Sequence, residues 1–468
     1  MRLSSVLATA GLLSSANAAI KGFNYGATFN NNQAKTLVDF EYEFNAAKKL
    51  PGTNGWTSAR LYTMIQAGTA NAPISAIQAA INTKTTLLLG LWASAGPGIV
   101  NNEVAALKAA IAQYGSAFTD LVVGISVGSE DLYRITPTGI ENNSGPGAQP
   151  QQLVSYIQQV RNAIRGTPLA GKPVGHVDTW TAYVNASNNA VISNLDFLGM
   201  DAYPYFQTTM NNDVGRSSQL FFDAYQQTVA ASQGKPVWVT ETGWPVTGQT
   251  LNQAVPSPDN ARIFWEDVTC QLVDDNINLW YYILQDVQWG NPVPSFGIKP
   301  GGDLMQVSPL FDLSCPANAF ARLLIAIDKT DPQIVVGNGF TVELSPTIST
   351  VLVYDVRPEF AGMTCTLALH IPPISSSFAA PVQVRALGGI NVSRLDQTPN
   401  DNVNAAHIGS GDWLGTVTMV QPGRQYNIAS FPCEAGQRIG YLMDSIGGLE
   451  MNWFQMVNPA LGLFMLAG

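Results

Sequence analysis

The sequence predicts an α/β fold in which a (β/α)8 TIM barrel is followed by a smaller all-β sandwich domain. Three observations support this prediction. Eight short apolar runs alternate with helix-like segments between Gly22 and Leu284, and an acidic residue follows two of those runs. Beyond Cys315 the pattern changes to short strands separated by Pro and Gly. We therefore expect two folded domains in this chain of 468 residues.

The predicted barrel strands are runs rich in apolar and β-branched residues. They cover residues 22–25, 58–62, 85–92, 121–127, 174–179, 195–203, 237–240 and 278–284. Apolar residues at helical spacing mark the predicted crossover helices at 37–47, 74–81, 104–111, 153–164, 186–192, 217–231 and 261–272. This alternation suits a closed barrel, whose active site lies at the carboxyl ends of the strands. A doubly wound open sheet is the main alternative, but no Gly-rich phosphate loop follows the first run.

The last third of the chain reads as an antiparallel sandwich. After a possible helix at 317–327, the predicted strands are residues 340–344, 350–356, 364–371, 382–386, 414–420 and 438–443, and the apolar tail 461–466 is a last strand. We place the barrel domain at 19–315 and the all-β domain at 316–468. For the second domain we expect a carbohydrate- or wall-binding role, or help with folding. Trp413 and Trp453 are its candidate exposed aromatic residues.

The first residues have the features of a secretory signal peptide. Arg2 precedes a short apolar run, which ends at an Ala-x-Ala sequence, so residues 1–18 are the predicted signal. We therefore expect a secreted protein that is extracellular or wall-associated and has no membrane span. Three Asn-x-Ser sequons that fit export are predicted glycosylation sites at Asn142, Asn185 and Asn391.

The cysteines are expected to form disulfides, because an exported chain meets an oxidising compartment. Four cysteines allow three connectivities. One bridge in each domain is the preferred pairing, which gives Cys270 with Cys315 and Cys365 with Cys433. With three His and no two cysteines at ligand spacing, the sequence predicts neither a metal nor a cofactor.

The charge of the chain bears on its partners. The formal net charge is −10, which opposes binding to nucleic acid or to anionic lipid. A neutral polysaccharide is indifferent to this charge, and we expect such a polymer as the substrate of a monomeric protein.

The chain is organised around Val-Trp-Val-Thr-Glu-Thr-Gly-Trp-Pro at 237–245, which places Glu241 at the end of a predicted strand. Glu130 stands in the same way after the fourth strand. Glycoside hydrolysis uses two carboxyl groups that face each other across the bond, and a separation of about 5 to 5.5 Å gives retention while a wider gap gives inversion. The competing interpretation is structural, with Glu241 as a rim ion pair and Glu130 in a network with Asp131 and Arg134.

Four motifs in order resemble glycoside hydrolase family 17, the barrel-fold β-1,3-glucanases, and the fungal wall-associated branch is the most similar. They are Gly-Phe-Asn-Tyr-Gly (22–26), Val-Gly-Ser-Glu (127–130), Asp-Ala-Tyr-Pro-Tyr-Phe (201–206) and Val-Thr-Glu-Thr-Gly-Trp-Pro (239–245). The resemblance implies a retaining mechanism with Glu130 as acid/base and Glu241 as nucleophile. One departure is Ser129, where the common motif has the Asn that hydrogen-bonds the sugar 2-hydroxyl.

Further residues near the ends of the predicted strands are candidates for binding substrate. Aromatic rings there can stack on glucose faces, and polar groups can bind its hydroxyls. The candidates are Tyr25, Tyr62, Ser129, Trp180, Tyr203, Trp244 and Asp286, with Trp289 as a further aromatic residue. His176, His370 and His407 are interpreted as non-catalytic.

The predicted function is hydrolysis of internal β-1,3-glucosidic bonds in cell-wall glucan by a secreted, retaining enzyme. Two alternatives stay open. One is a β-1,3-glucan transglycosylase, which uses the same two carboxylates. The other is an inactive wall-binding structural protein, for which Ser129 is the support.

Residues 447–454, near the end of the chain, resemble a fungal β-sandwich domain known as the carboxy-terminal part of a ubiquitin-binding protein.

Overall fold

The structure is a computed structural model of the chain. It describes residues 18–53, 55–286, 290, 292–315, 318–319, 321–373, 382–400, 402–456 and 460–468. Residues 1–17 of the predicted signal peptide lie outside the described residues, and so does Trp289.

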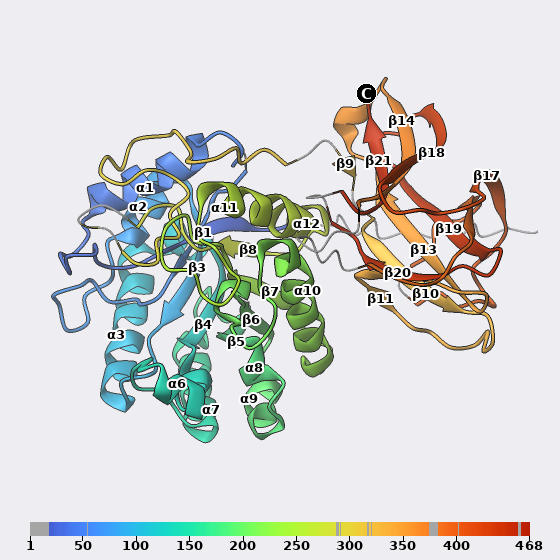
Figure 1. The fold of residues 1–468 in the computed structure, drawn as a ribbon. Helices are drawn as coiled ribbons and strands as arrows, with labels where there is room; N and C mark the ends of the chain where they lie inside the picture. The colour runs from blue at the N-terminus through green and yellow to red at the C-terminus, as the bar shows by residue number, and fades with distance from the viewer. Residues whose placement is uncertain are drawn as a thin grey trace, which may run out of the picture.

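Eight parallel strands close into a barrel, which confirms the predicted fold class. The strands are β1 (Lys21–Tyr25), β2 (Ser58–Leu61), β3 (Thr86–Leu91), β4 (Val122–Ser129), β5 (Val174–Thr179), β6 (Phe197–Asp201), β7 (Val237–Glu241) and β8 (Leu279–Tyr281). Pairing of Lys21 with Leu279 joins β1 to β8 and closes the ring. Figure 1 shows the barrel at the left, with its helices around the strands.

The helices of the barrel domain cover the outside of this ring. They are α1 (Leu37–Lys49), α2 (Ala76–Thr83), α3 (Pro97–Tyr114), α4 (Ser116–Thr119), α5 (Asp131–Arg134), α6 (Pro137–Glu141), α7 (Pro150–Ile164), α8 (Trp180–Tyr183), α9 (Asn189–Ser193), α10 (Val214–Ala231), α11 (Pro258–Phe264) and α12 (Cys270–Asp274). In α1 the apolar spacing buries Phe40, Phe44 and Ala47 against the strands. The helix predicted at 261–272 is continuous but has a π-helical turn at Trp265–Thr269 between α11 and α12.

Aromatic side chains fill the end of the barrel at which the strands begin. Phe197 stacks on Trp238 with 3.8 Å between ring centroids, and Trp280 lies beside Trp238. Gly175 leaves the space for this packing, because a methyl group there would collide with the ring of Phe197. With this end filled, the barrel offers a cavity at the carboxyl ends of its strands.

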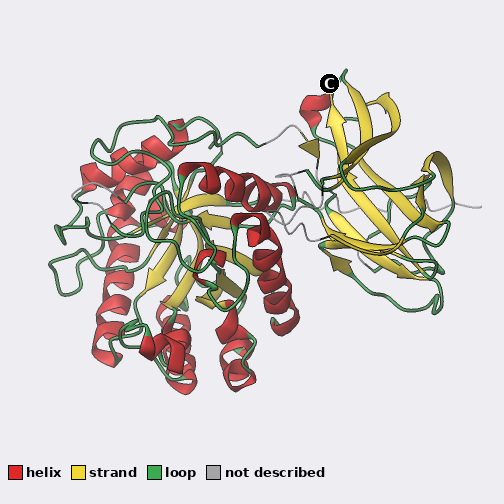
Figure 2. Ribbon diagram, in the orientation of Figure 1, coloured by secondary structure: helices red, strands yellow, loops and turns green. Residues whose placement is uncertain are grey.

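The remaining strands of the described residues form three antiparallel sheets. Figure 2 shows these strands in yellow at the right of the molecule. They are β9 (Asn318–Ala319), β10 (Leu323–Asp328), β11 (Asn338–Gly339), β12 (Thr341–Leu344), β13 (Ile348–Asp355), β14 (Thr364–Ile371), β15 (Val382–Ala386), β16 (Gly389–Leu395), β17 (Gly411–Val417), β18 (Arg424–Pro432), β19 (Arg438–Ile446), β20 (Glu450–Phe454) and β21 (Gly462–Ala467). The helix expected at 317–327 is wrong, because its described residues include β9 and β10. In β10 the residues from Leu323 to Asp328 pair with β13, so a sheet neighbour overrides the local helical spacing.

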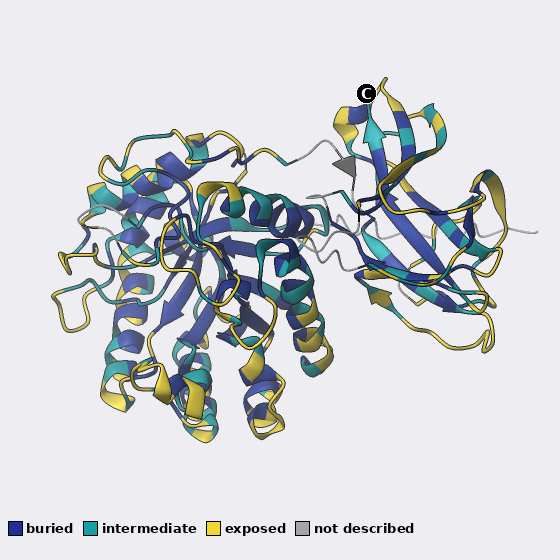
Figure 3. Ribbon diagram, viewed as in Figure 1, coloured by how far each residue is buried: buried dark blue, intermediate teal, exposed yellow. Residues whose placement is uncertain are grey.

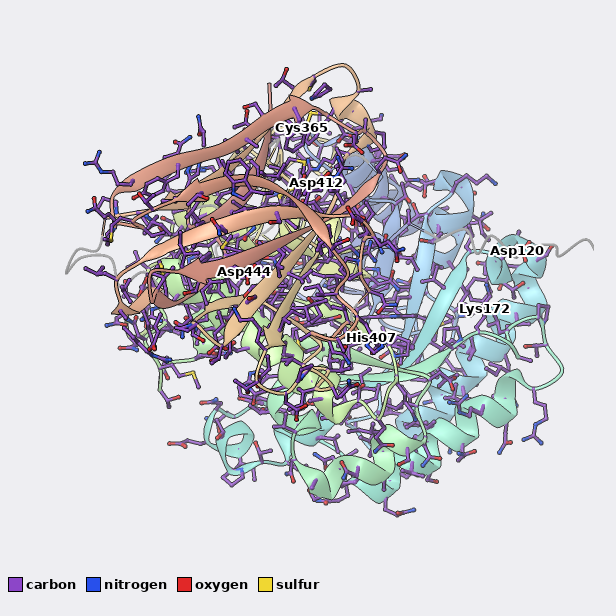
Figure 4. All side chains as sticks on the ribbon, turned by 90° about the vertical axis from the view of Figure 1, so that its right-hand side faces the viewer. Asp120, Lys172, Cys365, His407, Asp412 and Asp444 are labelled. Atoms are coloured by element: carbon purple, nitrogen blue, oxygen red, sulfur yellow. A yellow bond between two sulfur atoms is a disulfide. The ribbon has the colours of Figure 1, made fainter. Side chains whose placement is uncertain are left out.

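Each domain contains one disulfide, and the two domains lie against each other. The disulfides Cys270–Cys315 and Cys365–Cys433 confirm the predicted pairing, and Figure 4 labels Cys365 in the β domain. At the junction, Phe340 packs on Phe222 of α10 with 4.4 Å between ring centroids. Buried residues of both domains belong to one hydrophobic cluster, and Figure 3 draws the buried segments of each domain in dark blue.

The two candidate aromatic residues of the β domain differ. Trp413 on β17 is 66% exposed, whereas Trp453 on β20 is 1% exposed and belongs to the core. The prediction that Trp453 is an exposed aromatic residue is wrong, because its ring packs inside the β domain.

Among the helices that the structure describes, none combines the length and apolar character needed to cross a membrane.

Candidate active site

A cavity of about 880 Å³ opens at the carboxyl ends of the barrel strands. Both predicted catalytic residues, Glu130 after β4 and Glu241 at the end of β7, line it. The parallel strands bring together two residues that are far apart in the sequence, because all strand ends point to the same rim. The two predicted carboxylates therefore share one cavity.

Three donors from the ends of two strands, β2 and β6, hold the carboxylate of Glu241. Arg60 of β2 forms an ion pair with Oε1, and the Tyr62 hydroxyl donates to the same oxygen at 2.7 Å. The Tyr203 hydroxyl donates to Oε2 at 2.8 Å. These three bonds fix the position of the carboxylate, and a nucleophile must be held in this way to attack.

Arg60 is a functional residue that the sequence reasoning missed. Its side chain is 1% exposed, and it also donates to Asn24 at 2.7 Å and to Ser129 Oγ at 3.0 Å. Arg60 therefore links the ends of β1, β4 and β7. The available signal was a charged residue within the apolar strand Ser58–Leu61, since an arginine is rarely buried unless it is paired.

Glu130 has a different environment from Glu241. It stands at φ 59°, in the left-handed region, between β4 and the short helix α5, and its side chain is about a quarter exposed. Burial raises the pKa of Glu130 to about 7, helped by the negative charges of Glu241 and Asp178 and opposed by Arg134 and Arg60. At neutral pH this carboxyl thus holds a proton for a substantial part of the time, as a general acid must.

Two of the aromatic candidates are core residues. Trp244 has no exposed surface, and its Nε1 donates to the Val255 carbonyl at 3.1 Å. Tyr25 is 3% exposed and packs edge-on against Phe44 of α1. Their predicted stacking on sugar is wrong, because the helices that surround the barrel cover both rings.

The other candidates lie nearer to the surface. Tyr62, Ser129 and Asp286 line the cavity. Tyr203 touches Glu241 as described, and its ring packs among other aromatic rings. Trp180 is half-buried at the start of α8 and is not among the cavity-lining residues. Asp286 accepts hydrogen bonds from Ser295 Oγ and the Phe296 amide, both at 2.7 Å.

Two further cavity residues were missed from the sequence. Trp92, just after β3, is 44% exposed and presents an indole to the cavity, where a sugar ring can stack. Glu103 of α3 also reaches the cavity and accepts bonds from Thr63 Oγ and the Met64 amide. The position of Trp92 at the end of a predicted strand could have indicated that it binds substrate. Glu103 lies in a helix, and no feature of the sequence around it indicates such a role.

The described residues hold no group of three or more His, Cys, Asp or Glu side chains that is arranged to bind a metal ion. The polar groups of the cavity are carboxylates, hydroxyls, amides and two cationic side chains. Such groups suit the binding of a neutral, hydroxyl-rich ligand.

A closed barrel with two carboxyl groups in one cavity, one held by three donors and the other with a raised pKa, defines a protein of the glycoside hydrolase class. Residues 22–298 match the family model described as the BtgE/BtgC glycoside hydrolase domain. The chain belongs to this family. Residues 319–459 match the model of the ubiquitin 3 binding protein But2 C-terminal domain.

Named relatives come from fungi. The chain is 55% identical to a probable glucan endo-1,3-β-glucosidase of Aspergillus oryzae over 315 residues. These residues cover 67% of this chain and 67% of the relative. It is 31% identical to a glucan 1,3-β-glucosidase of Saccharomyces cerevisiae over 62% of this chain and 90% of the relative.

Solved structures that are similar to this chain include two of the glycoside hydrolase family 17 β-1,3-glucanosyltransferase from Rhizomucor miehei. Both are 27% identical to this chain and cover 63% of it and 98% of their own length. The TM-scores are 0.50 and, for an active-site mutant in complex with laminaritriose, 0.51.

Proposed function

We propose that this protein hydrolyses internal β-1,3-glucosidic bonds of cell-wall glucan with retention of configuration. The observation that carries the proposal is that Glu130 and Glu241 share one cavity but have opposite environments. Glu241 is held by Arg60 and by two tyrosine hydroxyls, while burial raises the pKa of Glu130 to about 7. The names of the fungal relatives support β-1,3-glucan as the substrate.

In this mechanism the Glu241 carboxylate attacks the anomeric carbon, and Glu130 gives its proton to the departing glycosidic oxygen. Glu130 then takes a proton from water as the water attacks the glycosyl-enzyme ester, which releases Glu241. Arg60, Tyr62 and Tyr203 orient the nucleophile. Ser129 Oγ, which accepts from Arg60, lines the cavity where it can contact a sugar hydroxyl.

The test compares the wild type with Glu241→Gln on laminarin-type glucan. We expect the substitution to lower kcat by several orders of magnitude, because the nucleophile has no substitute. Glu359→Gln, at an exposed carboxyl of the β domain, is the matched control and should keep full activity. Proton NMR of the first product should show the β-anomer. Equal rates for the wild type and Glu241→Gln would instead favour an inactive wall-binding structural protein.

A second candidate is a β-1,3-glucan transglycosylase, in which a sugar hydroxyl replaces water in the second step. The 27% identity to the Rhizomucor miehei β-1,3-glucanosyltransferase favours it. Chromatography of the products formed from a defined β-1,3-oligosaccharide separates the two. Products longer than the starting oligosaccharide would replace hydrolysis as the main reaction.

We further propose that the protein is exported and acts outside the cell or in the wall, with the β domain binding wall glucan. The apolar amino-terminal sequence, the sequons and the two disulfides support export. Asn142 and Asn185 are exposed, and Asn391 is half-buried on β16. Trp413→Ala in the full chain should reduce retention on insoluble glucan. Equal retention of the variant and the wild type would remove Trp413 from the binding surface.

A further inference from the structure

A buried histidine lies directly below the turn that carries Glu130. His176 is on β5, has no exposed surface and packs against Gly128. Its Nδ1 lies 2.7 Å from the carbonyl oxygen of Val127 on β4. Its Nε2 lies 2.9 Å from Oδ2 of Asp178. The ring therefore bridges the ends of two neighbouring barrel strands.

The partners of His176 determine its protonation state. A carbonyl oxygen such as that of Val127 can only accept a hydrogen bond. Asp178 already accepts the backbone N–H groups of Leu132 at 2.8 Å, Tyr133 at 3.2 Å and Thr179 at 2.8 Å, so its oxygens also act as acceptors. Both ring nitrogens must then donate, and His176 is an imidazolium cation.

The charges around the ring agree with this assignment. Burial opposes the positive charge, but the hydrogen bond and charge of Asp178, together with the charge of Asp131, raise the pKa of His176 above its usual value. The titratable groups that face the ring are Asp178 on its own strand, Asp131 on α5 and Tyr183 on α8. Asp178 is the direct ion-pair partner of the ring at 2.9 Å, and a buried charge needs such a partner.

The turn above His176 needs this support. Gly128 and Glu130 both have positive φ values, of 86° and 59°, and Glu130 is not a glycine. A side chain at Gly128 would collide with Asp131 and crowd the His176 ring. The amide of Glu130 donates to the Val177 carbonyl at 2.9 Å, which ties the turn to the strand that bears His176. The backbone of Glu130 is thus held from β5 and from the first turn of α5.

We propose that His176, as a buried imidazolium bonded to Val127 and Asp178, is a positioning residue that fixes the direction in which Glu130 projects into the cavity. It does not touch substrate. The proposal rests on the proposed function, because it assigns Glu130 the role of general acid. Loss of the ring charge frees Asp178 and the α5 turn, and Glu130 then misses the glycosidic oxygen.

The test uses the full chain with His176→Gln and His176→Phe, and His407→Gln in the β domain as the control. Each is assayed on a β-1,3-oligosaccharide and on an aryl β-laminaribioside with a dinitrophenol leaving group, which departs without a proton. We expect kcat/KM on the oligosaccharide to fall on the order of 10²-fold, as for a misplaced catalytic group. The rate of the glycosylation step on the activated aryl glycoside should stay unchanged, and His407→Gln should behave as the wild type on both substrates.

A purely structural role would lower both rates together, and unchanged rates on both substrates would remove any role. Either result overturns the proposal. If the wild type and Glu130→Gln both fail to cleave glucan while the wild type is folded, the proposed function itself fails. If instead the wild type and its His176 variants are equally active, only the proposal for His176 fails and the proposed function stands.

The charge of His176 is measured on the wild type, so this test does not depend on how the variants fold. The chain has three histidines, and nitrogen NMR distinguishes an imidazolium from a neutral ring. At pH 7 both nitrogens of the His176 ring should carry protons, with the signal assigned by its loss in His176→Gln. A neutral His176 ring at pH 7 would contradict the proposal.

Discussion

Arg60 shows how a single residue prepares the site. Its guanidinium is buried below the cavity and reaches Asn24, Ser129 and Glu241, which come from three different strands. A buried charge is stable only when it is paired, so Arg60 and Glu241 each make the position of the other favourable. Glu130, by contrast, pairs with Arg134 at 3.6 Å, its one ion-pair partner among the described residues, and both side chains are partly exposed.

The pH dependence of activity follows from Glu130. A general acid works in its protonated form, and burial raises the pKa of Glu130 to about 7. We therefore expect kcat/KM on β-1,3-glucan to fall as the pH rises above about 7. Because Arg134 lowers this pKa, Arg134→Gln should move the alkaline limb to higher pH. Initial rates between pH 4 and pH 9 measure both effects.

The control for this prediction is Arg161→Gln, which removes a surface arginine that pairs with Asp196 away from the cavity. Its pH profile should match that of the wild type. An alkaline limb that stays in place for Arg134→Gln, or that moves equally for Arg161→Gln, would separate Glu130 from the pH dependence.

At the scale of the element, helix α3 organises one wall of the cavity. Glu103 extends from α3 and accepts hydrogen bonds from Thr63 and Met64, which follow β2, and from the backbone of Trp92, which follows β3. One helix thereby holds two strand-end loops. The loops carry cavity residues, so the helix sets the shape of the site without contacting the catalytic pair.

The stability of the protein should depend on Glu103 in a defined pH range. Burial raises the pKa of Glu103 to about 7, although its hydrogen bonds oppose this shift. From about pH 4.5 to pH 7 the folded chain binds this proton more tightly than the unfolded chain. The contribution of Glu103 to the free energy of unfolding therefore falls as the pH rises through this range.

Urea unfolding at several pH values checks this prediction. Glu103→Gln should remove part of the decline in stability between pH 4.5 and pH 7, because its amide does not titrate. Glu141→Gln, at an exposed position of α6, is the control and should keep the wild-type slope. Parallel slopes for the wild type and Glu103→Gln would show that Glu103 does not titrate in this range.

At the scale of the whole molecule, the barrel and the β domain share a packed boundary. Phe340 contacts Phe222 and Tyr225 of α10. Arg357 of the β domain binds both carboxylate oxygens of Asp274 on α12, at 2.8 and 2.7 Å. The Cys270–Cys315 disulfide joins α12 to the segment that leaves the barrel. The β domain therefore packs on the region of the barrel that the Cys270–Cys315 disulfide cross-links.

Replacement of Cys270 and Cys315 by Ala should lower the free energy of unfolding by about 2 to 5 kcal/mol, because the bridge restricts the unfolded chain. Denaturant unfolding of the double variant against the wild type measures this change. A mass spectrum of the wild type should show no free thiol at either position. Free thiols at both positions would refute the prediction, as would an unchanged stability of the double variant.

Much of the fold follows from local pattern. Strand and helix periodicity alternate along the first two-thirds of the chain, and such periodicity depends on residues that are close in sequence. The predicted helix at 317–327 shows the limit of this reasoning, because β10 is a strand through its pairing with β13. Trp244 shows another limit, since its place at a strand end predicts exposure, whereas the helices that surround the barrel bury it.

The sequence by itself determined the barrel and the two carboxylates at strand ends, because both follow from patterns along the chain, and it favoured one disulfide in each domain. Only the tertiary structure decided that Arg60, Tyr62 and Tyr203 converge on Glu241, and that His176 lies below Glu130. These contacts join residues on different strands, and their distances are set by how the ring closes. Burial and the resulting shifts in pKa are properties of that packed arrangement, which no segment of the sequence contains.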